Sequence, residues 1–231
     1  TAITRRVQEA DSVDGIAVVR EELKSALPAL VDSGASAAVI MRLLTSVHDT
    51  VTTRLLQLAM DELGPPPVRF AFVAMGSAGR EEENLLTDQD NGIIYQDPER
   101  NKAADVKEYF LTLGRRVTHG LDQAGYPFCR GGLMADNPQW CAPLSEWRRH
   151  ASRWISGAEP IDLVRFDMFF DFRCVYGATE LVSDLRQFVL DEVAVRPEFL
   201  MHFARNAVSY RLPLGFFGTI RVRSAGVHAN T

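Results

Sequence analysis

The strongest constraint on the fold is the stretch 70–95, which reads FAFVAMGSAGREEENLLTDQDNGIIY. An apolar run ends abruptly at Gly76, a polar segment follows, and a second apolar run begins soon after Asp90. Short apolar runs that end in glycine or polar turns are typical of buried strands. We therefore predict a strand, a tight turn, a short helix over residues 79–86 and a second strand.

Two carboxylates, Asp88 and Asp90, stand one residue apart just before the second apolar run. Residues i and i+2 of an extended chain share a face, so these side chains can share a cation. Mg²⁺ prefers oxygen ligands and is usually bound by one or two carboxylates plus substrate phosphates. Gly76 lets backbone N–H groups approach a ligand closely, and a helix N-terminus just after it favours an anion. A phosphate cradle beside a metal-binding pair is the minimum that nucleotidyl transfer requires.

The stretch resembles the nucleotidyltransferase superfamily of DNA polymerase beta at Gly76, Ser77, Arg80, Glu82, Asp88, Gln89 and Asp90. Within it, the stretch most closely resembles the branch of the PII-protein uridylyltransferases. More narrowly, it is similar to a nucleotidyltransferase family often fused to CBS and cyclic-nucleotide-binding domains. This resemblance runs from about Val39 to the C-terminal end. It implies transfer of an NMP from an NTP to a hydroxyl of a protein or small-molecule acceptor, in signalling or regulation.

The resemblance also implies a role for each motif residue. Asp88 and Asp90 would hold two Mg²⁺ ions, for which Mn²⁺ could substitute. Gly76 and Ser77 would hold the β- and γ-phosphates of the NTP. Arg80 could contact the nucleotide phosphates or pair with a carboxylate, and both interpretations stay open at this point. The carboxylate would be that of the supporting motif residue Glu82 or of another neighbour.

Residues 167–176, DMFFDFRCVY, alternate in a way that predicts a third strand. An Asp inside such an apolar strand is costly unless it is paired or metal-bound. The superfamily resemblance calls for a third carboxylate from a later strand; Asp171 fits this place, and Asp167 is the weaker candidate. Asp171 would then complete the second metal site and accept the hydroxyl proton. The alternatives are a buried salt link between Asp171 and Arg173, or an Asp at the edge of a strand.

Other sites that the stretch could form fit less well. Asp88, Asp90 and Glu99 fall at positions 1, 3 and 12 of an EF-hand loop, but Ile93 stands where that loop needs Gly. No Gly-Lys-Ser/Thr follows as in a P-loop, and the glycines lack the GxGxxG spacing. Two alternatives remain: a purely structural turn, and a regulatory module that binds nucleotide and metal without turnover.

The composition bounds the partners and the location of the protein. The chain has 231 residues, of which 46% are apolar and 24% charged, as in a soluble globular protein. A net charge of −5 without a basic stripe argues against a nucleic-acid polymer as partner. No signal peptide or apolar run near 20 residues predicts secretion or membrane insertion. We expect a cytoplasmic protein with reduced thiols at Cys129, Cys141 and Cys174.

We predict an α/β (α+β) fold in which helices flank a small mixed sheet. The expected segments are an N-terminal pair of antiparallel helices, a nucleotidyltransferase core and a truncated C-terminal helical segment: 1–66, 67–177 and 178–231. The irregular loop 126–145 should either line the nucleotide or acceptor pocket or pack over the core. His48, near an apolar helical stripe, fits a structural role better than a functional one.

Overall fold

A mixed sheet forms the centre of the fold, as predicted, and it has four strands. The computed structural model describes residues 1–157 and 160–209. The strand order is β3-β2-β1-β4; β1 is antiparallel to both β2 and β4, and β3 is parallel to β2. The strands are β1 (Phe70–Ala74), β2 (Asn91–Tyr95), β3 (Cys141–Pro143) and β4 (Arg173–Gly177).

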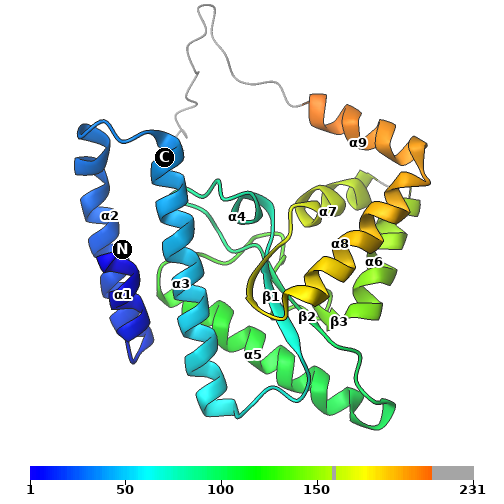
Figure 1. Ribbon diagram of the computed structural model, residues 1–231, viewed down its shortest axis with the longest axis horizontal. Helices are drawn as coiled ribbons and strands as arrows, with labels where there is room; N and C mark the ends of the chain where they lie inside the picture. The colour runs from blue at the N-terminus through cyan, green and yellow to red at the C-terminus, as the bar shows by residue number, and fades with distance from the viewer. Residues whose placement is uncertain (158–159, 210–231) are drawn as a thin grey trace, which may run out of the picture.

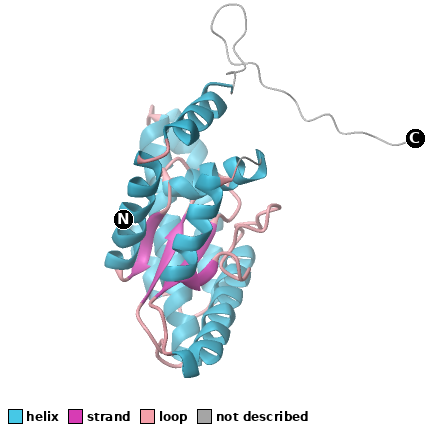
Figure 2. Cartoon of the chain, turned by 90° about the vertical axis from the view of Figure 1, so that its right-hand side faces the viewer, coloured by secondary structure: helices cyan, strands magenta, loops and turns pink. Residues whose placement is uncertain are grey.

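Helices cover both faces of this sheet (Figure 1). Figure 2 shows the strands enclosed between helices when the molecule is turned by a quarter. The α-helices are α1 (Ala2–Glu9), α2 (Val13–Asp32), α3 (Ala37–Leu63), α4 (Gly76–Gly79), α5 (Ala103–Gln123), α6 (Leu144–Ser156), α7 (Pro160–Phe170), α8 (Thr179–Ala194) and α9 (Pro197–Ser209). A 3₁₀ turn, Arg100–Lys102, precedes α5.

Side chains of β1 alternate between two hydrophobic layers because a strand has a period of two residues. Ala71 and Val73 belong to the core that β1 shares with α6, α7 and α8. Phe70 and Phe72 belong to the core on the other face, which includes α3 and α5. All five residues of β1 are buried, so the strand is covered on both faces, as its continuous apolar run predicts.

The N-terminal region contains three helices, so the prediction of two antiparallel helices over residues 1–66 is wrong in number. Helix α1 was not predicted from the sequence; Thr1 caps it through its side chain, and it buries Val7 completely. Ser12 and Ser36 cap α2 and α3 by accepting hydrogen bonds from backbone N–H groups.

The predicted helix over residues 79–86 is also wrong, because the helical turn comes earlier. It spans Gly76–Gly79 as α4, and the chain then turns at Glu81, whose φ of 60° is left-handed. Few non-glycine residues adopt this conformation, so a regular helix cannot continue through Glu81. The polar run that suggested a helix surface is a turn.

The strand predicted over residues 167–176 is shorter in the structure. Residues 167–170 belong to α7, and β4 begins only at Arg173. The aromatic residues explain the difference. Phe166, Phe169 and Phe170 recur at a spacing of three and four residues, which places them on one helical face. Phe166 and Phe169 are buried, with ring contacts to neighbouring helices. Packing of the aromatic face therefore overrides the alternating pattern.

The antiparallel pairing of β1 with both neighbours decides where the site can form. The register pairs Ala74, the last residue of β1, with Asn91 in β2 and with Arg173 in β4. The end of β1 therefore lies beside the beginnings of β2 and β4. The turn after β1 and the segments that lead into β2 and β4 meet at one edge of the sheet.

Two expectations lie outside what the fold tests. The division into three segments stays a prediction, and residues 210–231 of the predicted C-terminal segment lie outside the described residues. Among the helices that the structure describes, none is long and apolar enough to cross a membrane.

Gly79 gives a first testable expectation. A Cβ at this position would lie 1.9 Å from the carbonyl oxygen of Asp171, so Gly79→Ala must push α4 away from the segment before β4. We expect a loss of about 1–3 kcal/mol of unfolding free energy, measured by chemical denaturation. Gly15→Ala in α2 is the control, because its Cβ meets only ordinary contacts from 3.4 Å. Equal stability of the two variants would contradict the close approach.

Candidate functional site

Asp90 lies directly against the turn that follows β1. The Met75 N–H donates to the Asp90 carbonyl oxygen at 2.9 Å. A Cβ on Gly76 would lie 3.0 Å from the Asp90 Oδ2 atom. The φ of Gly76 is +55°, in the left-handed region that favours glycine. Glycine at this position therefore fits the turn conformation and keeps the space in front of the carboxylate open.

Gln89 separates the two carboxylates and turns into the protein. It is completely buried, and its Nε2 donates to the carbonyl oxygens of Thr118 and Tyr126, each at 2.9 Å. Asp88 and Asp90, on either side, remain partly exposed. Alternation in an extended segment explains this difference, because neighbouring side chains point to opposite sides.

The irregular loop between α5 and β3 holds the Asp88–Asn91 segment in place. Hydrogen bonds run from the Gln89 N–H to the Pro127 carbonyl (3.0 Å), from the Asn91 N–H to the Leu133 carbonyl (3.0 Å) and from the Ala135 N–H to the Asn91 side-chain oxygen (2.8 Å). The loop thereby satisfies buried backbone groups that a neighbouring strand would otherwise pair. This packing agrees with one interpretation of the loop over residues 126–140; contact with a nucleotide stays a prediction. The prediction of a loop is wrong for residues 141–145, which form β3 and the start of α6.

The electrostatic environment of Asp90 is unusual. Burial raises the pKa of its carboxyl group to about 6; a hydrogen bond with Cys129 opposes the shift, and the charge of Asp88 adds to it. The Asp90 Oδ1 atom is buried and has no hydrogen-bond partner within the part of the chain that the structure describes. A buried, charged oxygen without a donor is costly. The carboxylate would therefore gain from a bound cation.

Arg80 links the turn after β1 to the segment before β4. Its Nε donates to Glu82 and its Nη1 donates to the Asp171 Oδ2 atom, each at 2.8 Å. The predicted pairing with Glu82 and a neighbouring carboxylate is thus present in the structure. A contact of Arg80 with nucleotide phosphates stays a prediction.

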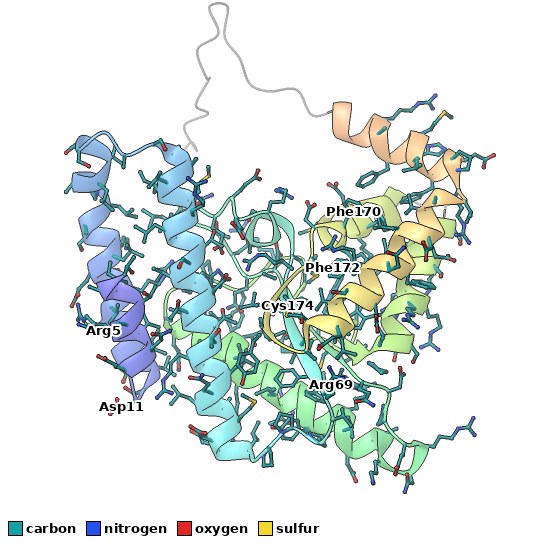
Figure 3. All side chains as sticks on the ribbon, viewed as in Figure 1. Arg5, Asp11, Arg69, Phe170, Phe172 and Cys174 are labelled. Carbon is teal, nitrogen blue, oxygen red and sulfur yellow. The ribbon has the colours of Figure 1, made fainter. Side chains whose placement is uncertain are left out.

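The alternative pairing of Asp171 with Arg173 is wrong. Arg173 donates to both carboxylate oxygens of Asp49 on α3, at 2.8 and 3.0 Å, and to the Ala78 carbonyl at 2.9 Å. Asp171 lies between α7 and β4, next to the labelled Phe170 and Phe172 in Figure 3, and not in a strand. The weaker candidate, Asp167, lies within α7.

A divalent cation fits the Asp88–Asp90 pair better than it fits all three carboxylates together. Among the described residues, no three His, Cys, Asp or Glu side chains gather into a group that could hold a metal ion. The pair supplies oxygen ligands, and Asp90 holds the unpaired buried oxygen. Asp171 is held by Arg80, so its Oδ2 atom could join such a site only if Arg80 moved.

A buried polar cluster, which was not predicted from the sequence, lies behind the turn. Glu83 is 2% exposed and pairs with His48 Nδ1, and the His48 ring stacks on Tyr126 with centroids 4.1 Å apart. Burial acts to raise the pKa of Glu83, but His48, Thr45 and Arg173 together lower it, and the pKa falls below its usual value. His48 thus packs structurally; its place on the apolar side of α3 was the signal for its burial.

Comparison with known families agrees with the chemistry of these residues. Residues 21–161 match the model of the family described as Putative nucleotidyltransferase DUF294, over more than half of the chain. The chain therefore belongs to this nucleotidyltransferase family. A search of curated proteins found no match. The match includes Gly76, Asp88 and Asp90 but ends before Asp171, so the third carboxylate has no support from it.

The pKa of Asp90 gives a second testable expectation. Its folded value of about 6 exceeds the unfolded value of about 3.9, so the folded state binds the extra proton. The contribution of Asp90 to the free energy of unfolding is therefore greatest below the unfolded pKa and is lost as the pH rises through 6. With divalent cations chelated, we expect Asp90→Asn to be more stable than the wild type by roughly 1–3 kcal/mol at pH 7.5.

This difference should shrink at pH 5, where the wild-type carboxyl group is largely protonated. Chemical denaturation of both proteins at the two pH values measures it. Asp122→Asn, which neutralises an exposed carboxylate on α5, should leave the wild-type pH dependence unchanged. Identical pH dependence of wild type and Asp90→Asn would show that Asp90 is not perturbed.

Proposed function

We propose that the protein transfers an NMP from an NTP to a hydroxyl group of a protein or small-molecule acceptor and releases pyrophosphate. One observation carries this proposal: a glycine turn faces the partly buried Asp90, with Asp88 beside it, at the end of β1. Membership in the nucleotidyltransferase family supports the class of reaction.

The turn binds the triphosphate in this proposal. The first N–H groups of α4 have no acceptor within their own turn, so they are available to an anion. Gly76 admits the ligand because no side chain fills the space before Asp90. The Ser77 hydroxyl adds a further donor. Arg80, whose side chain is 45% exposed, contributes positive charge beside the phosphates.

Asp88 and Asp90 would hold the metal ions, two Mg²⁺ or Mn²⁺. When bound, these ions neutralise triphosphate charge and lower the pKa of the acceptor hydroxyl. Asp90 must be ionised to serve as a ligand, and its pKa of about 6 leaves it ionised above neutral pH. The Gln89 amide fixes the backbone between the two carboxylates from the buried side.

The chemical step is an in-line substitution at the α-phosphorus. The acceptor oxygen forms a bond to that phosphorus, the bond to the bridging oxygen of the β-phosphate breaks, and pyrophosphate leaves. Asp171 accepts the hydroxyl proton once Arg80 turns from it toward the phosphates. Positioning and charge stabilisation supply most of the acceleration in such a reaction.

The finer assignment rests on the motif alone. Its resemblance to the PII-protein uridylyltransferases supports a role in signalling, and UTP is the first nucleotide to test. Attached CBS or cyclic-nucleotide-binding domains in a longer protein would supply the signal. In the alternative regulatory module, the same residues bind nucleotide and metal without turnover.

The carboxylate pair gives the third expectation. The double variant Asp88→Asn plus Asp90→Asn should fold and yet lose Mg²⁺-dependent NTP binding, because two amides cannot replace two anionic metal ligands. Calorimetric titration with Mg²⁺ and each of the four NTPs measures this loss. The control, Asp61→Asn plus Asp122→Asn, removes two exposed charges and should bind normally. Unchanged binding by the folded site variant would refute the metal assignment.

Asp171 gives the fourth expectation, which separates chemistry from binding. Asp171→Asn can still accept the Arg80 hydrogen bond, so NTP affinity should stay nearly normal. Turnover should fall by about 10²–10⁴-fold, because an amide cannot accept the hydroxyl proton. Transfer of α-labelled phosphate to candidate acceptors measures turnover. Wild-type turnover by the folded variant would exclude this role, whereas NTP binding without any wild-type turnover would favour the regulatory module.

A further inference from the structure

Arg173 connects three parts of the protein that are far apart in sequence. As the first residue of β4, it lies opposite Ala74 in β1, next to the turn after that strand. Its guanidinium group binds both carboxylate oxygens of Asp49 on α3, at 2.8 and 3.0 Å. The Nη2 atom of Arg173, which donates to the Asp49 Oδ1 atom, also donates to the Ala78 carbonyl inside α4, at 2.9 Å. We call this set of contacts the Asp49–Arg173 bridge.

Helix α3 also contacts the far end of the same turn. His48, the residue before Asp49, pairs with the buried carboxylate of Glu83. Two consecutive residues of α3 thus contact the chain on either side of Arg80. Asp49 does so through Arg173 and the Ala78 carbonyl, and His48 does so through Glu83. Figure 1 shows α3 running beside α4 and the sheet.

The exposure and chemistry of the bridge suit a positioning role. The side chains of Arg173 and Asp49 are 23% and 33% exposed, so solvent screens the pair only in part. A bidentate guanidinium–carboxylate contact fixes orientation as well as distance. An arginine has enough donors in a rigid fork to bind the carboxylate and the Ala78 carbonyl together, which the single ammonium group of a lysine cannot do in the same geometry.

We propose that Asp49 and Arg173 are positioning residues that hold the Gly76–Glu82 segment in its nucleotide-binding geometry and thereby couple α3 to the site. The first claim is that the bridge holds the segment in place. The second claim, that it thereby affects nucleotide affinity, rests on the proposed function. A shift of α3 would pull on the Ala78 carbonyl through Arg173. Movements in the N-terminal helices thereby change the geometry of the turn that faces Asp90.

Amide hydrogen exchange tests the first claim without any ligand. The N–H groups of Gly79, Arg80 and Glu82 donate to carbonyl oxygens at the start of the turn, those of residues 75, 76 and 77, at 3.0, 3.1 and 2.9 Å, so they report its opening. Asp49→Ala and Arg173→Met should each accelerate exchange over residues 76–82 by roughly 2- to 30-fold. Exchange in α5 is the internal reference and should stay at its wild-type rate.

The matched control is another ion pair that joins the end of a strand to a helix. Arg69, which precedes β1, binds Glu180 of α8 at 2.9 Å. It lies at the opposite end of β1 from the turn, as its label in Figure 3 shows. Arg69→Ala should leave exchange over residues 76–82 unchanged. Unchanged exchange there in Asp49→Ala, or an equal rise in α5, would reduce the bridge to a general stabilising contact and overturn the proposal.

Nucleotide titration tests the second claim on the same proteins. The Kd for Mg²⁺ with ATP, GTP, CTP or UTP should rise in Asp49→Ala by roughly 2- to 30-fold, and not in Arg69→Ala. Faster exchange with a wild-type Kd would overturn the coupling to the site. A wild type that binds none of the four nucleotides would count against the proposed function, while exchange would still decide whether the bridge positions the turn.

Discussion

The candidate site depends on the antiparallel pairing of β1 with two strands that come later in the chain. Because Ala74 is paired with Asn91 on one side and Arg173 on the other, a single strand end meets two strand beginnings. The turn, the carboxylate pair and Asp171 reach one edge of the sheet by this pairing alone. Parallel pairing with either neighbour would have sent one of these segments to the opposite edge.

Close backbone approach explains two of the glycines at this edge, for different reasons. Gly76 has a left-handed φ and faces the Asp90 carboxylate, so a side chain would strain the backbone and fill the ligand space. Gly79 touches the Asp171 carbonyl group, so a side chain would separate α4 from the start of β4. Gly76 thus keeps the space in front of Asp90 open, and Gly79 lets the backbone of α4 pack against the Asp171 carbonyl group.

The charges of the site differ in how they are compensated. Asp171 is paired with Arg80 and Asp49 with Arg173, whereas Asp90 has a buried oxygen without a donor and a raised pKa. The folded state would be more stable if a positively charged group also paired with Asp90. A carboxylate with one buried, unpaired oxygen is therefore a cost in stability that a bound cation can offset, which links the electrostatics to the proposed function.

Local sequence alone determined β1, β2, the glycine turn and the carboxylate pair, because each depends on neighbouring residues with a clear period or spacing. It did not determine the secondary structure of residues 167–170, where an alternating pattern and a helical spacing coexist. There the packing of Phe166 and Phe169 stabilises the helix. The partners of Arg80 and Arg173 were decided by tertiary structure. Asp49 and Arg173 are 124 residues apart, and only the folding of α3 against β4 brings them within hydrogen-bond distance.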